Sequence, residues 1–517
     1  MAGAWHRVRA LGLGAVAVAA ALLALTMGTL VLVLMQAGGA GLAAADWAAV
    51  RFTLWQAALS ATISVGLAVP VARALFRRRF AGRGALIALL GAPFLLPVIV
   101  AVLGLLAVFG RAGVVNRGLE ALGLPAVSIY GLHCVVLAHV FLNMPLAVRM
   151  ILQGWQAIPG ERFRLASALG LGPGAVWRHL EWPMLRGVVP GAAVAVFTIC
   201  LSSFAVALVL GGGPRATTVE LAIYQALRFE FDLPRAALLA AVQFGLCGAA
   251  VAAAGMVTVP AGFGAGVGRR GWVFAPGGWR RGLDGLMIAL AAGFLGVPLL
   301  AVVWRGAPGL MDLPHSVWAA AGRSVLVALV SCGVAVSGAL VLALAVARGR
   351  RGFEVAAMLP LAASSLVLGT GLFLAVQAWV SPVRVALPVT VLVNAALALP
   401  FAFRILLPEA RGMQAEYGQL AEALGLRGVA RLRWLILPRL RRPLGFALGV
   451  CAALAMGDLG VIALFAAEQG ATLPLVVQRL TGAYRMEAAA GAALLLVVIS
   501  FALFWLFDWG GRRGAEA

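Results

Sequence analysis

The sequence has no lysine and little charge of any kind. Of its 517 residues, 11% are charged and 63% are hydrophobic, and Asp and Glu together number 18. A water-soluble protein cannot cover so apolar a chain with polar surface, so a large soluble enzyme is excluded. The phosphate-binding motif G-x-x-x-x-G-K-[ST] is excluded as well, because it requires a lysine. Any process driven by ATP therefore needs a separate ATPase subunit.

Side chains that hold metals or perform catalysis are scarce. The five cysteines stand singly in apolar stretches, without a C-x-x-C pair, and the five histidines form no ligand cluster. We find no paired carboxylates at catalytic spacing, no H-E-x-x-H and no nucleophile elbow. We therefore expect no metal site, no cofactor bound by this chain and no enzymatic activity.

Long apolar runs take up most of the chain. A helix needs about 20 apolar residues to cross a bilayer, and twelve runs of roughly that length or more are present. They lie near residues 11–35, 53–75, 85–109, 131–151, 188–210, 236–260, 284–304, 322–347, 354–380, 386–407, 443–466 and 486–508. We therefore predict an all-α integral membrane protein with about 12 transmembrane helices.

The forty cations are all arginines, and their distribution predicts an orientation. With the N-terminus in the cytoplasm, 29 of the 40 fall in the loops or termini on the inner side. Because positive residues concentrate in cytoplasmic loops, this distribution predicts that both termini are cytoplasmic. It also explains the formal charge of +22 without a nucleic-acid partner. The basic loops favour contact with anionic membrane lipid.

The chain contains one pattern twice. Residues 165–171 (LASALGL) match residues 420–426 (LAEALGL), and the same offset carries Pro183 onto Pro438. Each copy holds six spans, an even number, so both copies enter the membrane in the same orientation and form a parallel repeat. We predict a first six-span repeat over 1–262, a cytoplasmic Gly- and Arg-rich linker over 263–282 and a second six-span repeat over 283–517.

Each repeat carries a long loop between its fourth and fifth spans. In each loop a helix of small residues ends at a glycine, Gly170 or Gly425, and an amphipathic helix then runs to Pro183 or Pro438. This pattern predicts a knob that projects into the cytoplasm. Two interfacial helices lying on the lipid are the alternative. A duplicated knob agrees better with two equivalent partner subunits.

Each loop resembles the EAA loop of ABC importer permeases, whose pattern is E-A-A, three residues, Gly, nine residues, Ile, one residue and Leu-Pro. Both copies keep the motif's spacing from the glycine to the proline. The matching positions are Arg164, Ala166, Gly170, Leu180 and Pro183 in the first loop, and Gln419, Ala421, Gly425, Leu435 and Pro438 in the second. Arg164 and Gln419 depart from the pattern, because the motif has glutamate at their position.

Four further segments resemble the fused permeases that import thiamine and thiamine pyrophosphate. They are residues 51–61, 72–80, 210–227 and 457–465, and the most specific is 210–227. The resemblance implies a type I ABC importer permease in the bacterial inner membrane. It also implies two copies of an ATPase subunit, which bind ATP and Mg, and an extracytoplasmic binding protein that delivers the solute.

Two other functions fit parts of the sequence. Segment 457–465 is shared more loosely with ferric-iron permeases, so ferric-iron import is an alternative. An ion-coupled secondary transporter can also have parallel six-span repeats. That class is expected to have several intramembrane acids, whereas Asp458 is the one we place within a span, and it has no need of two equivalent knobs.

Few polar residues lie where a solute would cross the membrane. Asp458 falls in the outer part of the eleventh span, and Ser202 and Ser203 lie at the equivalent depth in the first repeat. A carboxylate there suits a cationic solute, but we favour a structural explanation, which is an ion pair with an arginine such as Arg228 or Arg485 or a helix-packing hydrogen bond.

Further polar residues lie in the segments on the outer side of the membrane. They could form an external gate, or they could be the solvated part of a re-entrant loop. They are Glu220, Tyr224 and Gln225 in the first repeat and Gln478 in the second.

Overall fold

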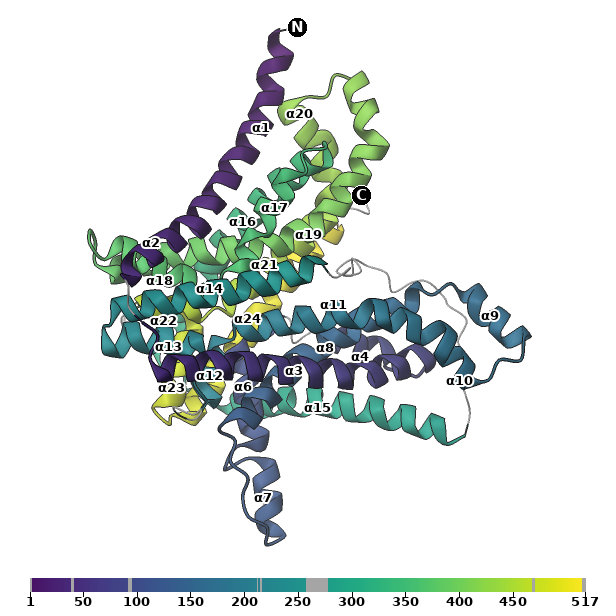
Figure 1. Ribbon diagram of the computed structural model, residues 1–517, viewed down its shortest axis with the longest axis vertical. Helices are drawn as coiled ribbons and strands as arrows, with labels where there is room; N and C mark the ends of the chain where they lie inside the picture. The colour runs from purple at the N-terminus through teal and green to yellow at the C-terminus, as the bar shows by residue number, and fades with distance from the viewer. Residues whose placement is uncertain are drawn as a thin grey trace. The chain divides into compact units, whose positions relative to one another are not determined.

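The computed structural model of the chain describes residues 2–38, 41–91, 95–211, 213, 216–256, 278–466 and 470–513. Within this part of the chain all regular secondary structure is helical (Figure 1). The prediction of an all-α protein is therefore confirmed. Contacts between the helices divide the chain into two compact units.

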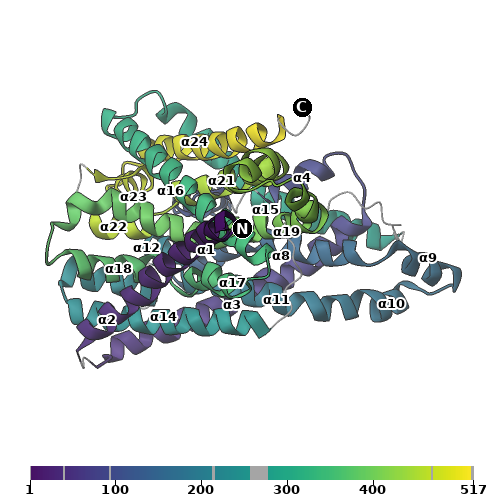
Figure 2. The ribbon, with the colours of Figure 1, turned by 90° about the horizontal axis from the view of Figure 1, so that it is seen from above.

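Unit 1 comprises Met1–Ala43, Val219–Gly248 and Gly309–Ala517. Its helical elements are α1 (Ala2–Leu23), η1 (Ala24–Gly28), α2 (Thr29–Ala37), α13 (Val219–Gln225), η4 (Ala226–Glu230), α14 (Leu233–Met256, as far as Gly248), α16 (His315–Ala347), α17 (Gly352–Met358), η5 (Leu359–Ala362), α18 (Ser365–Val376), η6 (Pro382–Val385), α19 (Ala386–Ala423), α20 (Gly428–Arg431), η7 (Leu432–Ile436), α21 (Leu437–Met456), α22 (Gly460–Phe465), α23 (Leu473–Gly482) and α24 (Met486–Arg513). In this unit α1 packs against α16, and α2 packs against α18 (Figure 2). The first span of the chain thus lies among helices of the second half of the sequence.

Unit 2 comprises Ala44–Thr218 and Ala249–Pro308. Its helical elements are α3 (Ala44–Arg77), α4 (Arg83–Leu89), α6 (Val98–Phe109), α7 (Val114–Ala121), α8 (Leu132–Ala157), α9 (Gly160–Ala168), α10 (Pro173–Val176), η2 (Trp177–Glu181), α11 (Trp182–Leu201), α12 (Phe204–Leu210) and α15 (Trp279–Gly309, as far as Pro308). Helices α3, α8 and α11 pack against one another (Figure 1). Helix α15 joins them, because the ring of its Phe294 meets Phe141 of α8 edge-on with centroids 5.7 Å apart.

The boundaries predicted at 1–262, 263–282 and 283–517 divide the chain by its sequence repeat. They stay a prediction, because the two compact units are defined by contacts between helices and not by the repeat. Residues 263–277 of the predicted linker lie outside the described residues. The compact units group the chain by contact, and each of them takes in the first span of the opposite half.

The expected number of spans is confirmed. In the described residues eleven helices are long and apolar enough to cross a membrane, and one bent pair of helices brings the number to twelve. The predicted runs 11–35, 131–151 and 486–508 correspond to spans Gly12–Ala37, Leu132–Ala157 and Met486–Arg512. Length and hydropathy were sufficient to locate these helices.

Two of the predicted spans are interrupted close to a proline. The run 354–380 contains a bend of 88° between η5 and α18, and Pro360 lies in η5 just before the bend. The run 85–109 is interrupted between α4 and α6, and Pro97 directly precedes α6. Proline lacks the amide hydrogen that a helix interior needs, which favours a break at these two positions. Proline does not break every span, because α3, α8 and α19 continue through Pro70, Pro145 and Pro400.

Helix α15 shows how one helix separates its lipid-facing and inward-facing sides. Its exposed large apolar residues include Leu283, Leu286, Leu290, Val297, Leu300 and Trp304. Its buried residues are Asp284, Ala291, Leu295, Pro298, Val302 and Gly306. Both sets recur at intervals of three, four or seven residues, which places each on one side of an α-helix.

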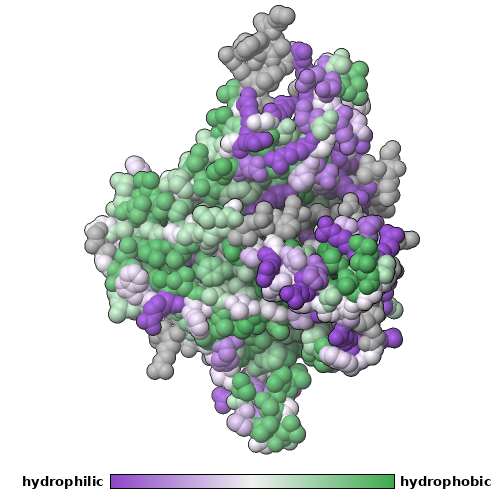
Figure 3. Space-filling view, turned by 45° about the vertical axis from the view of Figure 1, so that its right-hand side comes forward, coloured by the Kyte–Doolittle hydropathy of each residue, from purple (hydrophilic) through white to green (hydrophobic). Residues whose placement is uncertain are grey.

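The surface agrees with a membrane environment. Apolar side chains cover much of the face seen in Figure 3. Polar side chains gather at the end of unit 1 that carries α20 and the adjoining part of α19. Such a surface suits a protein whose flanks contact lipid and whose helix ends reach water.

Candidate functional site

The two loops recognised in the sequence contain the same elements in the same order. Each consists of the end of a helix, a short helix and a π-helical turn: α9, α10 and η2 in the first loop, and α19, α20 and η7 in the second. From the end of α9 onward, each bound is separated from its counterpart by the offset of the sequence repeat. The duplication in the sequence is therefore a duplication of local structure.

One detail of the predicted loops is wrong. Pro183 and Pro438 do not end a helix, because each is the second residue of a long helix, α11 or α21, that continues into the span. In both loops a π-helical turn precedes that helix. Proline is tolerated in the first turn of a helix, where its missing amide hydrogen costs little.

A glycine turn closes the first helix of each loop. Gly170 has a φ of 66° and Gly425 a φ of 65°, in the left-handed region that favours glycine. In the first loop the amide of Leu171 donates to the carbonyl of Ala166 at 2.9 Å, and the amide of Gly170 donates to Ser167 at 3.0 Å. The second loop has both bonds at the equivalent positions, at 2.8 Å and 3.0 Å. This pair of bonds is the Schellman motif, which ends a helix at glycine.

The motif-like positions divide into buried and exposed ones, identically in the two loops. Ala166 and Ala421 are buried, and Leu180 and Leu435 are half-buried; the exposed positions are Arg164, Gln419, Gly170, Gly425, Pro183 and Pro438. Apolar side chains between them are also exposed: Leu165 by 61% and its counterpart Leu420 by 55%, and Leu169 and Leu424 by 66% each. Each loop thus presents leucine side chains to its surroundings at matching positions.

The inner side of the first loop packs onto the end of α3. Phe163, Ala166 and Val176 form a buried cluster with half-buried Phe76 and Leu180. The rings of Phe76 on α3 and Phe163 on α9 have centroids 5.7 Å apart. Burial of these side chains fixes the loop to the helix.

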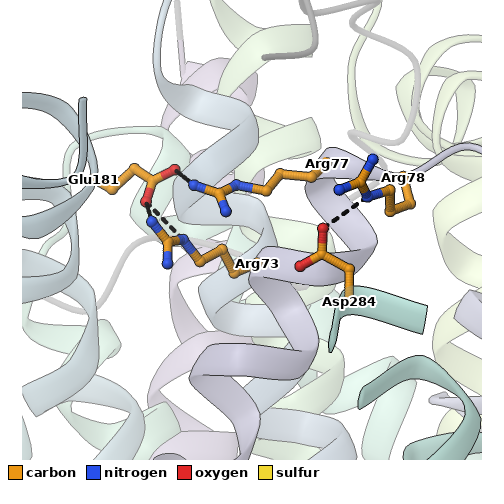
Figure 4. Close-up of polar contacts among 5 residues, drawn as sticks. All are labelled: Arg73, Arg77, Arg78, Glu181 and Asp284. Carbon is orange, nitrogen blue, oxygen red and sulfur yellow. Dashed lines mark hydrogen bonds and ion pairs between the residues drawn. The ribbon is translucent and has the colours of Figure 1, made fainter. Parts of the chain in front are cut away.

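Glu181, at the end of η2, was not predicted as a site residue. Its Oε2 accepts hydrogen bonds from Arg73, and its Oε1 accepts one from Arg77 (Figure 4). Both arginines lie near the end of α3, far earlier in the chain. The one available sequence signal was an isolated acid between two tryptophans in an arginine-rich loop.

The fifth and eleventh predicted spans are each broken at the same repeat position. Helix α11 ends before Ser202 and Ser203, and α21 ends before Gly457 and Asp458. The runs predicted at 188–210 and 443–466 thus contain a helix break that their hydropathy did not predict. Serine, aspartate and glycine all favour helix ends over helix interiors, so these residues explain the breaks.

The break in unit 1 places the carboxylate of Asp458 against the backbone at the start of α22. Its Oδ1 accepts a hydrogen bond from the amide of Gly460 at 3.3 Å. Its Oδ2 is buried and has no hydrogen-bond partner within the described part of the chain. In unit 2, the Ser202 hydroxyl donates to the carbonyl of Ile199 at 3.3 Å, and Ser203 is half-buried. The alternative of an ion pair between Asp458 and Arg228 or Arg485 is not realised among the described residues.

Glu220 is the most deeply buried of the predicted path residues. It lies on α13 with no exposed surface, and neither carboxylate oxygen meets a hydrogen-bond partner at bonding geometry in the described residues. Gln243 and Ser364 are its neighbouring polar side chains. Tyr224, Gln225 and Gln478 are half-buried elsewhere on α13 and on α23 of the same unit. Unit 1 therefore carries both acids of the predicted path.

Metal chemistry has no support in the part of the chain that the structure covers. No group of three or more His, Cys, Asp or Glu side chains there could hold a metal ion. The arrangement offers hydrogen-bond acceptors and two carboxyl groups instead.

Comparison with known proteins supports a transport function. No family model matches the chain. The thiamine transport system permease protein ThiP of Brucella abortus (strain 2308) is 38% identical over 508 residues, which cover 95% of this chain and 93% of that protein. The protein of the same name from Escherichia coli (strain K12) is 39% identical over 489 residues, or 89% and 88% of the two chains.

A shorter match links the chain to another permease. The molybdenum transport system permease protein ModB of Mycobacterium bovis is 35% identical over 167 residues, 32% of this chain and 62% of ModB. The near full-length matches place the chain in a family of transport subunits that are not enzymes and that span the bacterial inner membrane many times. The chain belongs to the ThiP family of transport system permeases.

Proposed function

We propose that this chain is the transmembrane subunit of an ATP-driven ABC importer that carries thiamine and thiamine pyrophosphate into the cell. The observation that carries the proposal is the near full-length similarity to permeases that are named for thiamine transport, at 38% and 39% identity. Ferric-iron import and ion-coupled transport are the alternatives that the sequence left open.

The duplicated loops support coupling to two copies of an ATPase subunit. Each loop ends its first helix at a left-handed glycine and exposes leucine side chains at matching positions. Exposed apolar clusters outside the membrane are typical of protein-binding surfaces. ATP and Mg bind to the partner subunits in this mechanism. Since Arg164 and Gln419 replace the motif glutamate, docking here relies on shape and apolar contact.

The orientation of the chain completes the mechanism. Both termini and both loops lie in the cytoplasm, and the opposite ends of the spans receive the solute from an extracytoplasmic binding protein. ATP binding to the partner subunits and delivery by the binding protein each favour one of two conformations of the permease. The solute then crosses by alternating access.

The path residues suit a cationic solute. Thiamine carries a permanent positive charge on its thiazolium ring and an amino group on its pyrimidine ring. Glu220 and Asp458 each have buried carboxylate oxygens without hydrogen-bond partners in the described residues, and such oxygens favour a cation or a donor group. Tyr224, Gln225 and Gln478 add polar groups for such a solute in unit 1, and Ser202 and Ser203 add polar groups in unit 2.

Uptake into proteoliposomes tests the proposed substrate. The liposomes contain this chain, its ATPase subunit and its binding protein, and labelled thiamine, thiamine pyrophosphate and ferric iron are offered separately. We expect uptake of the thiamine compounds, with no uptake of iron. Uptake of iron alone would establish the ferric-iron alternative and contradict the proposal.

A further inference from the structure

The carboxylate of Glu181 is bound by two arginines inside unit 2 (Figure 4). Arg73 reaches Oε2 with Nη2 at 2.6 Å and Nε at 2.8 Å, so it binds through two nitrogens. Arg77 reaches Oε1 with Nη2 at 3.0 Å. Glu181 and Arg77 are buried, with 1% and 5% of their surfaces exposed. Charge-assisted bonds of this kind hold their groups in a fixed geometry.

The same arginines contact other elements. The guanidinium of Arg73 lies 4.2 Å from the ring centre of Trp177, at the start of η2. Arg78, one residue beyond Arg77, donates to Oδ2 of Asp284 at 2.7 Å. Asp284 lies on α15, the first span of the second half (Figure 4). Arg73 and Arg77 therefore join the first loop to α3. The neighbouring Arg78 joins the end of α3 to α15.

The second loop has an apolar residue at the equivalent position. Ile436 takes the place of Glu181 in the second repeat, at the end of η7, and is also buried. Two polar contacts of the second loop run to α19: Arg431 donates to Gln414 at 2.8 Å, and Arg439 donates to Tyr417. Its one ion pair to another helix in the described residues is exposed, between Arg411 and Glu354 of α17 at 3.0 Å. An isoleucine cannot form the ion pairs that Glu181 forms.

We propose that Glu181 is a positioning residue that transmits movement of the first loop to α3 and, through Arg78 and Asp284, to α15. The inference rests on the proposed docking of ATPase subunits to the loops. The two loops then differ in how they drive the membrane helices: the first loop acts through buried ion pairs, and the second through apolar packing around Ile436. A movement carried by ion pairs requires both charges, because a lone buried charge is poorly accommodated.

The test is the number of thiamine molecules imported per ATP hydrolysed, measured in proteoliposomes for the wild type and for Glu181→Gln. Glutamine keeps the shape of the side chain and removes its charge. We expect the ratio to fall about tenfold, since charge-assisted hydrogen bonds contribute more than neutral ones, while the ATPase subunits still bind the permease. A purely structural role would lower uptake and ATP hydrolysis together and leave the ratio unchanged, which would overturn the inference.

Two further variants complete the experiment. Glu161→Gln breaks an exposed ion pair of the same loop, with Arg164 at 3.0 Å, and should leave the ratio unchanged. Asp284→Asn removes the contact on α15 without altering the loop and should lower the ratio, even if Glu181→Gln fails to fold. A normal ratio in Asp284→Asn would contradict the link to α15. If the wild-type protein shows no ATP-dependent uptake of thiamine, that result would instead contradict the proposed function itself.

Discussion

Gly170 and Gly425 hold the same left-handed backbone conformation at the same position of two loops that belong to different halves of the sequence. A Cβ atom added at either glycine would meet no atom within 4 Å beyond the neighbouring residues of the chain. Substitution therefore strains the backbone without causing a steric clash, at a cost of about 1–2 kcal/mol.

We expect Gly170→Val and Gly425→Val each to lower ATP-dependent uptake several-fold while the protein still inserts into the membrane. The strain opens the turn that aligns the two helices of the loop, so the docked ATPase subunit loses its alignment. Gly172→Val is the matched control, because Gly172 also lies in open space but has a φ of −68°. Equal losses of uptake in Gly170→Val and Gly172→Val would show that the turn conformation is irrelevant.

The exposed leucines of the loops predict an effect on binding. Leu169→Ser and Leu424→Ser should each weaken binding of the ATPase subunit to the detergent-solubilised permease, and the double variant should weaken it further. Thermal stability should change little, because both side chains are 66% exposed and serine removes no core contact. Leu122→Ser, at an exposed position after α7, is the control and should bind the ATPase normally. Unchanged binding in the double variant would exclude these leucines from the interface.

The arginine distribution predicts which side of the membrane each loop faces. All five native cysteines are buried, so a single exposed cysteine can be labelled selectively. In intact spheroplasts, a membrane-impermeant maleimide should label Leu122→Cys but not Leu169→Cys. In inverted vesicles the pattern should be reversed. Labelling of Leu169→Cys in spheroplasts would contradict the N-in, C-in orientation.

Substitution of Glu220 should affect thermal stability and thiamine transport in different ways. Glu220→Gln removes a fully buried carboxyl group whose oxygens have no hydrogen-bond partner in the described residues. An unpaired buried carboxylate is costly, so the melting temperature should stay the same or rise. If the carboxylate contacts the cationic solute, KM for thiamine uptake should increase about tenfold. An unchanged KM would remove Glu220 from the solute path.

Hydropathy and the internal repeat were sufficient to predict the number of spans and the position of both loops. An apolar run and a glycine turn each depend on residues that are neighbours in the sequence, and the repeat shows that the same turn occurs twice. The breaks at Ser202 and Asp458 were not predicted, since hydropathy averages over the one or two polar residues that end a helix. The ion pairs of Glu181 were missed for a different reason. Their arginines had been explained by membrane orientation, and only the folded chain brings them to a carboxylate that is distant in the sequence.

The energy source of transport tests the central claim most directly. Thiamine uptake should be measured in proteoliposomes that contain the chain, its ATPase and its binding protein, with ionophores present to abolish proton and sodium gradients. We predict that uptake continues in the presence of the ionophores and stops when the ATPase is omitted. It should also require ATP on the side of the membrane that carries the ATPase. Uptake that needs no ATPase and is abolished by ionophores would contradict the account and establish an ion-coupled transporter.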